Sequence, residues 1–218
     1  MHEQPTGADA QMLGRLTLPL GEVIGTQRSI RRFRPDPLPV EDLHVLLEAA
    51  VRAPNGGNRQ PARFLVLTER DRVRRFGALY RDAWWAKRRD EGRAWRTRDD
   101  IPAEEPVSRS AARLADEMQD APCIVLALTL GPGQASSVLP AVQNLMLAAR
   151  ALGIGSVPTT LHPDVTERVR ALLGIPREAE LHLCIPLGYP RGRFGPTRRL
   201  PTTETTFFEQ WAAPPPWG

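Results

Sequence analysis

Residues 26–33 read Thr-Gln-Arg-Ser-Ile-Arg-Arg-Phe and place three arginines and one serine within six consecutive positions. Arg28, Ser29 and Arg31 can bind one phosphate together, because a guanidinium group donates two parallel hydrogen bonds to phosphate oxygens and a hydroxyl group adds a third. Ile30 and Phe33 give the same segment apolar anchors. A solvated basic strand has a similar composition, so the segment taken alone leaves both interpretations open.

The sequence on either side of this basic segment indicates helices bounded by prolines. Residues 19–25 predict a short helix that leads into the segment, and the alternate prolines of residues 35–39 predict extended backbone after it. From Val40 onward, apolar residues recur at helical spacing and predict a buried face made of Leu43, Leu46, Leu47, Ala50 and Val51. Pro54 ends this helix.

A glycine-rich loop follows, in which residues 53–61 read Ala-Pro-Asn-Gly-Gly-Asn-Arg-Gln-Pro. Adjacent glycines let a flat ligand approach the backbone, and the amides of Asn55 and Asn58 offer hydrogen-bond donors and acceptors to the edge of a ring. The alternative is an ordinary turn before a strand, which the spacing by itself favours.

The remainder of the chain alternates between short apolar runs and helical patterns. We expect strands at 64–68, 123–130, 156–160 and 181–187, and helices at 71–85, 110–119, 136–152 and 164–173. The run at 123–130 is the most apolar, so we place the core there. The glycines near residue 155 follow a helix and lack the third member of a dinucleotide-binding loop, which excludes a Rossmann fold.

Residues 81–100 are charged throughout, yet they contain Trp84, Trp85 and Trp95. A solvated helix does not need three tryptophans. Clustered aromatic residues with polar neighbours are typical of contact surfaces, so we expect these three to form a substrate pocket or to cover a partner.

Composition bounds the class of protein. At 218 residues the chain is long enough for one core, and we expect a single domain after a flexible N-terminal arm at residues 1–16. There are 29 basic residues against 25 acidic ones, and every basic residue except Lys87 is arginine. Because acids are interspersed among the arginines, we do not expect nucleic acid as a partner, although it stays a minor alternative.

Other features indicate a reduced, cytoplasmic protein. Cys123 and Cys184 lie inside apolar runs, where a free thiol behaves as a small hydrophobe. The four histidines are scattered without the spacing of metal ligands, so we predict no metal site. Neither a secretory signal nor an apolar run of the roughly 20 residues that a membrane helix needs is present, so we expect no membrane partner.

Five segments in order carry a resemblance to a known family: Arg-Ser-Ile-Arg-Arg-Phe, Pro-Asp-Pro-Leu-Pro, the loop of residues 53–61 with the strand after it, the helix up to Gly155, and the Ile-Pro-Leu-Gly-Tyr-Pro segment with a later Arg-Arg-Leu-Pro. Together they resemble the flavin-dependent nitroreductase family over roughly residues 20–202. The resemblance implies an α+β fold with a central mixed, mainly antiparallel sheet flanked by helices. It also implies a homodimer that holds FMN at the subunit interface.

The resemblance also assigns residues to the flavin. Arg28, Ser29 and Arg31 would bind the phosphate and ribityl groups of FMN, joined by Gln27, which stands where many members have arginine. Pro54, Asn55 and Asn58 would line the ring from the other subunit, and Thr159 and Thr160 would present backbone to its reducible edge. Arg198 and Arg199 would close on the phosphate. No side chain is expected to be an essential acid or base, since the flavin carries the chemistry.

The implied function is hydride transfer from NADH or NADPH through FMN to a nitroaromatic, a quinone or a similar conjugated acceptor, by a ping-pong mechanism. Departures from the family pattern at Gln27, Asn55, Ala62 and Thr197 argue against assigning the substrate of better-known members. Two alternatives stay open. One is an oxidase or dehydrogenase of a specialised metabolite, or a flavin-consuming relative, on the same fold. The other is a non-enzymatic protein that binds flavin or nucleic acid.

The last segment, residues 202–218, follows the final motif and carries four large aromatic residues. Left in water they would form an exposed apolar patch of the kind that marks an interaction surface. We therefore expect the domain to comprise residues 17–201 and the C-terminal extension to clasp the partner subunit, as members of the family often do.

Overall fold

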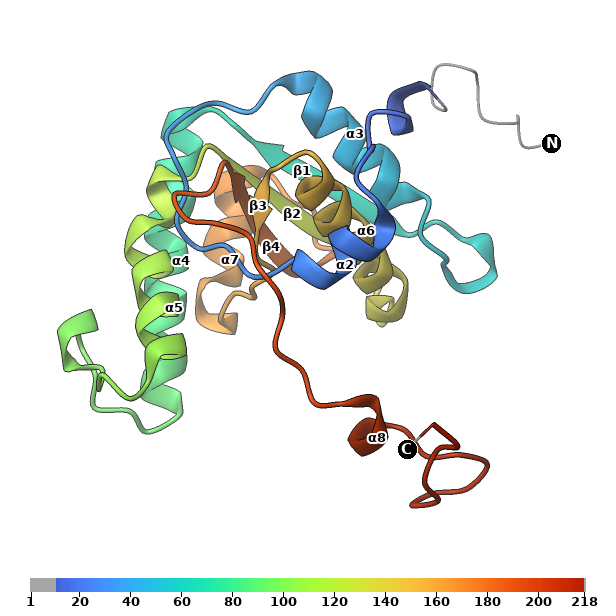
Figure 1. Ribbon diagram of the computed structural model, residues 1–218. Helices are drawn as coiled ribbons and strands as arrows, with labels where there is room; N and C mark the ends of the chain where they lie inside the picture. The colour runs from blue at the N-terminus through green and yellow to red at the C-terminus, as the bar shows by residue number, and fades with distance from the viewer. Residues whose placement is uncertain (1–10, 218) are drawn as a thin grey trace.

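The computed structural model describes residues 11–217, and it arranges them as a four-stranded sheet with helices on both faces (Figure 1). The strands are β1 (Ala62–Leu67), β2 (Cys123–Leu130), β3 (Gly155–Ser156) and β4 (Ala179–Gly188). The helices of more than one turn are α2 (Leu20–Thr26), α3 (Val40–Val51), α4 (Arg70–Asp90), α5 (Pro106–Glu117), α6 (Ala135–Ala151) and α7 (Pro163–Leu173), and α8 (Thr202–Thr205) is a single turn. Short 3-10 turns occupy Gly56–Asn58, Arg98–Asp100 and Met118–Asp120.

The sheet has the strand order β1-β2-β4-β3, and each neighbouring pair is antiparallel. The α+β class is therefore confirmed. The expectation of a mixed sheet is wrong, because all pairs of neighbouring strands are antiparallel. In residues 11–217 parallel pairing occurs only as an isolated bridge between Ser29 and Ser156. That bridge attaches the basic segment to the outer edge of β3.

The core consists of two apolar clusters, one on each face of the sheet. Alternate residues of β2 belong to different clusters: Ile124 and Leu126 pack with α4, α5 and α7, while Val125 and Ala127 pack with α3 and α6. Because side chains alternate across a strand, a strand buried on both faces must be apolar throughout, as β2 is. The predicted core strand is confirmed.

The helices agree with their predicted positions, with differences at their ends. In α4, Val73, Phe76, Tyr80 and Trp84 recur at helical spacing and are buried, but the helix continues to Asp90 rather than ending near residue 85. In α3 the predicted buried face is wrong in two positions. Val51, predicted to be buried, is 55% exposed, and Val45, which the predicted face does not include, is fully buried. The α3–α6 contact lies on a slightly different stripe of the helix than the spacing indicated.

The predicted strand at 156–160 is shorter than expected. β3 ends at Ser156, and pairing resumes only as an isolated bridge between Thr159 and Cys184. Pro158 has no backbone N–H to donate to a ladder, which interrupts the strand and leaves Thr159 and Thr160 in a loop.

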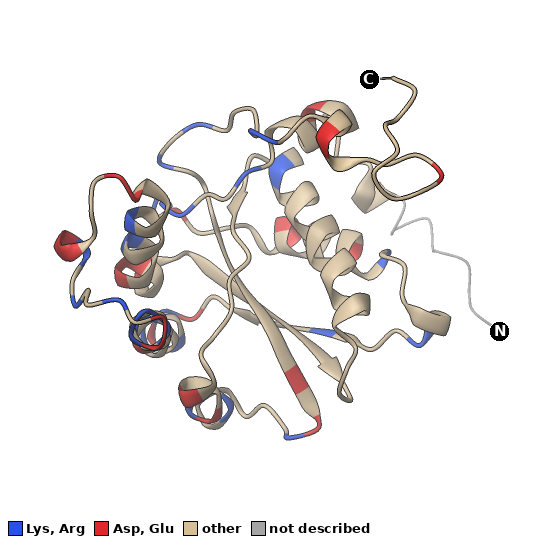
Figure 2. Ribbon diagram, turned by 90° about the horizontal axis from the view of Figure 1, so that it is seen from below, with Lys and Arg blue, Asp and Glu red and all other residues tan. Residues whose placement is uncertain are grey.

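Charged residues lie mostly outside the sheet, as the coloured ribbon of Figure 2 shows: the helices carry acids and bases intermixed, whereas the strands carry few charged positions. Residues 1–10 of the predicted arm lie outside the described residues. After them, Arg15 forms an ion pair with Asp42 of α3, and Leu16 packs against the core. Within residues 11–217 no helix is long and apolar enough to cross a membrane.

Candidate functional site

The basic segment is fixed by backbone contact with β3. The N–H of Ile30 donates to the carbonyl oxygen of Ser156 at 2.9 Å, and the Ile30 side chain is buried. A Cβ on Gly155 would lie 2.6 Å from Cγ2 of Ile30, so only glycine permits this approach. The backbone that carries Arg28, Ser29 and Arg31 is therefore held against the edge strand β3 by the buried Ile30.

Arg28 and Arg31 form a positively charged pair. Partial burial lowers the pKa of the Arg31 guanidinium, and the positive charge of nearby Arg28 lowers it further, while Tyr80 has the opposite effect. Within residues 11–217 neither arginine has an ion pair with a carboxylate. Two unpaired guanidinium groups close together favour an anion, and a phosphate group fits that requirement.

The loop after β3 joins this edge of the sheet to α4. The hydroxyl groups of Thr159 and Tyr80 lie 2.9 Å apart, and the Thr159 N–H donates to the carbonyl of Cys184 at 3.0 Å. Lys87 donates from its Nζ to the carbonyl oxygen of Thr160 at 2.7 Å and to the Thr160 hydroxyl. Burial lowers the pKa of Lys87 and raises that of Tyr80. Thr159 and Thr160 are thus held from the α4 side.

Residues after β4 return to the basic segment. The N–H of Thr197 donates to the carbonyl of Gly25 at 3.1 Å, and a Cβ on Gly195 would lie 3.8 Å from Nη1 of Arg28. Arg198 and Arg199 follow directly and are exposed. Of the predicted flavin residues, Arg28, Ser29, Arg31, Thr159, Thr160, Arg198 and Arg199 therefore lie on segments that adjoin one another. The partly buried Gln27 faces α6 instead, with its Nε2 3.9 Å from the sulfur of Met146.

The glycine-rich loop lies elsewhere in the same subunit. Figure 1 shows the segment between α3 and β1 on the side of the molecule opposite α4 and α5. Oδ1 of Asn55 accepts from the N–H of Gln60 at 2.8 Å, and the N–H of Gly56 donates to Ser137 at 3.3 Å. Gly57 and Asn58 have positive φ, at 60° and 51°. One subunit alone does not bring Pro54, Asn55 and Asn58 to the basic segment.

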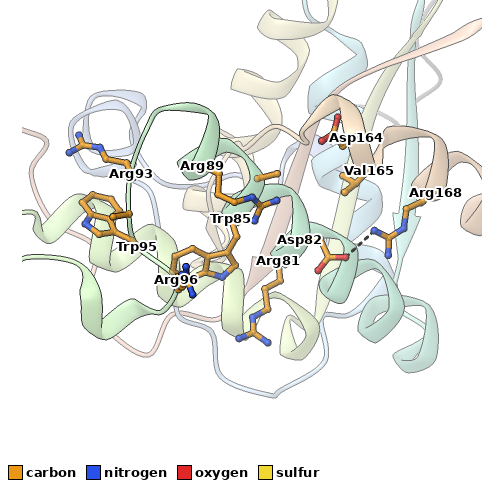
Figure 3. Close-up of a pocket in the computed structure, with 12 residues that line it drawn as sticks. Arg81, Asp82, Trp85, Arg89, Arg93, Trp95, Arg96, Asp164, Val165 and Arg168 are labelled. Atoms are coloured by element: carbon orange, nitrogen blue, oxygen red, sulfur yellow. Dashed lines mark hydrogen bonds and ion pairs between the residues drawn. The ribbon is translucent and has the colours of Figure 1, made fainter.

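A pocket of about 860 Å³ lies between α4, α7 and the loop after α4 (Figure 3). Trp85 and Trp95 line it, whereas Trp84 is buried behind Trp85, with ring centroids 4.6 Å apart in an edge-to-face arrangement. The lining includes the arginines Arg81, Arg89, Arg93, Arg96 and Arg168 and the aspartates Asp82 and Asp164. The predicted tryptophans are thus divided between a pocket wall and the core.

His162 links α4 to α7 beside this pocket. Its Nε2 lies 2.8 Å from Oδ2 of Asp90, and its Nδ1 accepts from the N–H of Asp164 at 3.2 Å. His162 is buried, so it fixes the end of α4 against the start of α7. Among the described residues no group of three or more His, Cys, Asp or Glu side chains could hold a metal ion.

Sequence reasoning missed several of these residues. Lys87 carries a signal, since it is the only lysine among 29 basic residues. The role of Tyr80 has no local signal, because its spacing in α4 indicates only a buried face. The sequence gives no reason to single out Arg89 and Arg96 among the many arginines, because only the folded chain places them in a pocket lined by two helices and a loop.

The fold is an α+β sheet whose outer edge carries an arginine-rich segment beside the loop of Thr159 and Thr160. Comparison with protein-family models matches residues 24–189 to the nitroreductase family, and the chain belongs to that family of oxidoreductases. An NADH dehydrogenase of Thermus thermophilus is 34% identical over 196 residues, which cover 80% of this chain and 88% of the relative. An iodotyrosine deiodinase of Thermotoga neapolitana is 31% identical over 167 residues, covering 75% and 84%.

A solved structure agrees with this assignment. The crystal structure of an oxidized iodotyrosine deiodinase, bound to FMN and 3-iodo-L-tyrosine, has a TM-score of 0.70 and 27% identity to this chain. The match covers 88% of this chain and 99% of the other. Arg28 and Arg31 have no carboxylate partner within residues 11–217, and the contact of Thr197 with Gly25 brings the segment of Arg198 and Arg199 to theirs, so the charge gathered here matches that of a phosphate group.

Proposed function

We propose that the protein is an FMN-dependent oxidoreductase that passes a hydride from NADH or NADPH to a conjugated acceptor such as a nitroaromatic or a quinone. The observation that carries the proposal is the Arg28–Arg31 pair, which lacks carboxylate partners within residues 11–217 and lies beside the loop of Thr159 and Thr160. When bound, the flavin would supply the hydride and electron chemistry.

The protein's own residues would bind and orient. Arg28, Ser29 and Arg31 would hold the phosphate by charge-assisted hydrogen bonds, with Arg198 and Arg199 adding charge from the later segment. Lys87 and Tyr80 would keep the Thr159–Thr160 segment in one position, since from α4 Lys87 donates to the Thr160 carbonyl oxygen and the Tyr80 hydroxyl bonds the Thr159 side-chain hydroxyl. A backbone held in one position at the reacting edge of the flavin would help catalysis by orienting the reacting groups, and not by transferring a proton.

A second copy of the chain would complete the site. The loop carrying Pro54, Asn55 and Asn58 lies away from the basic segment of its own subunit, which is the arrangement that a contribution from the partner requires. We therefore propose a homodimer that holds two flavins at its one subunit interface, each site using residues of both subunits.

An anaerobic absorbance experiment tests the proposal. Purified protein reconstituted with FMN should retain flavin absorbance through gel filtration, and stoichiometric NADH or NADPH should bleach it. A nitroaromatic or quinone added afterwards should restore the absorbance. Protein that retains no FMN would overturn the proposal.

A second candidate is a flavoprotein of the same fold with a different substrate or direction, such as an oxidase of a specialised metabolite. The observation in its favour is that relatives of similar identity carry different names, a deiodinase at 31% and an NADH dehydrogenase at 34%. Retained flavin that neither nicotinamide bleaches would favour this candidate.

A further inference from the structure

We propose that Arg150 is a positioning residue for the flavin phosphate: it holds the return segment, residues 189–199, beside the basic segment, and this contact makes the site select FMN over riboflavin. The inference rests on the proposed flavin-dependent function. It deepens that function by naming a residue of α6, far in the sequence from the arginine motif, that decides how strongly the phosphate is recognised.

The return segment lies beside residues 25–34 and runs in the opposite direction. In Figure 1 the chain after β4 passes the end of α2 on its way to α8. Three backbone hydrogen bonds and one side-chain contact join the two stretches at matching positions: Arg34 with Tyr189, Arg32 with Arg191, Arg28 with Gly195 and Gly25 with Thr197. The basic segment is therefore held by the return segment as well as by β3.

Arg150 joins the return segment to two helices. It lies in the last turn of α6, where its Nε donates to the Thr26 hydroxyl at 2.8 Å and its Nη2 to Oε1 of Glu22 at 3.2 Å, both in α2. The same guanidinium group lies over the ring of Phe194 in the return segment, 4.4 Å from the centroid. Arg150 is buried, so water weakens these contacts little.

The shape of the guanidinium group explains why arginine stands at this position. Its N–H groups donate in the plane of the group, toward Thr26 and Glu22, while its flat face stacks on an aromatic ring. A lysine ammonium group could replace the ion pair, but it has no flat face to stack. Because Phe194 directly precedes Gly195, which contacts Arg28, the position of the ring sets the course of the segment that follows.

The consequence is a concentration of positive charge beside the basic segment. Arg28 and Arg31 come from the basic segment, and Arg198 and Arg199 come from the return segment. Within residues 11–217 none of these four has an ion pair with a carboxylate. Like charges repel, so the second pair of arginines stays near the first only if the return segment is held, and a phosphate relieves the repulsion. Gln27, where many members of the family have arginine, adds no charge.

Titration of the full-length, flavin-free protein with FMN and with riboflavin tests the proposal, because the two ligands differ only in the phosphate. Quenching of flavin fluorescence gives both dissociation constants. Wild-type protein should bind FMN more tightly than riboflavin by roughly a hundredfold, the scale of two charge-assisted hydrogen bonds. Arg150→Gln should weaken FMN binding by about tenfold and leave riboflavin binding within about twofold.

Two substitutions of Phe194 test the stacking contact, and they decide the question alone if Arg150→Gln fails to fold. Phe194→Leu keeps an apolar side chain but removes the ring, so it should weaken FMN binding by roughly threefold and spare riboflavin. Phe194→Tyr keeps the ring face and should match wild type. An FMN preference that is unchanged in Phe194→Leu would overturn the proposal.

The control is Arg170→Gln. The side chain of Arg170 is 14% exposed, against 11% for Arg150, and it also binds one acidic side chain and one further acceptor, Glu167 and the carbonyl oxygen of Pro176. Its loss should lower the melting temperature without changing the ratio of the two dissociation constants. If Arg150→Gln weakened FMN and riboflavin equally, or kept the wild-type ratio, Arg150 would be a merely structural residue and the proposal would be overturned.

Limited proteolysis tests the contact without any flavin. Trypsin cleaves after arginine, and Arg198 and Arg199 are exposed. Arg150→Gln should be cut there severalfold faster than wild type, because a released segment opens more often. Unchanged cleavage would show that Arg150 does not hold the return segment.

The same measurements separate this proposal from the proposed function. Wild-type protein that binds FMN and riboflavin equally well would overturn the role of Arg150 and leave the flavin-dependent function standing. Wild-type protein that binds neither ligand would reject the proposed function itself, and the selection of a phosphate with it.

Discussion

Arg28 and Arg31 make a prediction at the scale of single residues. Arg28→Ala and Arg31→Ala should each raise the dissociation constant of FMN, because each removes a charge-assisted hydrogen bond worth on the order of 1.5–3 kcal/mol. The measurement is fluorescence titration of the apoprotein with FMN. Arg74→Ala is the control, since Arg74 is exposed on α4 and is not among the residues that line the pocket. If all three variants bound FMN as wild type does, the phosphate would have to lie elsewhere.

The two cysteines give a second prediction at this scale. Burial raises the pKa of Cys123 and of Cys184 to about 12 in the folded protein. Because burial disfavours the thiolate, this part of the stability is present below the unfolded thiol pKa of about 8.5 and is lost as pH rises from there through about 12. At pH 8.5 the native protein should therefore resist iodoacetamide, whereas both thiols should react in guanidinium chloride. Mass spectrometry reads out both samples, and rapid labelling of native protein would contradict the prediction.

At the scale of elements, α4 depends on a close contact at Gly77. A Cβ on this residue would lie 2.5 Å from the backbone of Gln119, in the 3-10 turn that leads to β2. Gly77→Ala should therefore destabilise the protein by about 1–3 kcal/mol, even though alanine is the better helix former, since overpacking forces the backbone apart. Urea unfolding followed by circular dichroism measures the change.

Gly21→Ala is the matched control, since Gly21 is helical in α2 and an added Cβ would meet no atom within 4 Å. There the intrinsic helix preference should act alone and stabilise by up to about 1 kcal/mol. The opposite signs of the two substitutions are the diagnostic result. Equal effects would show that α4 and the turn can separate without cost.

At the scale of the whole molecule, the C-terminal segment contributes little to the core of its own subunit. Figure 1 shows it leading away from the sheet to α8 and beyond. Phe207 contacts Trp211 with ring centroids 4.5 Å apart, yet Trp211 is 85% exposed. Phe208 and Trp217 also remain exposed. Covering such residues contributes roughly 1.5–3 kcal/mol each, so a second subunit is the surface that we expect them to contact.

Truncation after Pro201 tests this expectation. The shortened protein should already dissociate to monomers at protein concentrations where the wild type is still dimeric. It should also bind FMN more weakly and melt at a lower temperature, because the proposed site takes its flavin-facing loop from the partner. Light scattering, flavin titration and thermal unfolding measure the three effects. A truncated protein that remains dimeric, retains FMN and melts as wild type does would reject the clasp.

Much of the fold was predictable because its signals are local. The apolar run of β2, the helical spacing in α4 and α6, and Pro54 at the end of α3 depend on neighbours along the chain. The same holds for the arginine segment, whose composition indicates an anion site before any contact is known. Helix ends, strand lengths and the exact buried face of a helix were less accurate, as α4, β3 and Val51 show in turn, because packing between elements decides them.

By itself, the sequence determined the α+β class, the family pattern and the residue types available to a flavin. Only the tertiary structure decided which of them meet. Ile30 and Ser156 are more than a hundred residues apart in the sequence, yet they are in contact. The loops of Asn55 and Thr159 are also more than a hundred residues apart in the sequence, but they stay apart in the folded subunit. The pocket of Arg89, Arg96, Trp85 and Trp95 likewise needs α7 as its second wall. Periodicity specifies which face of an element is apolar, but the partner of that face depends on the free energy of packing the whole chain.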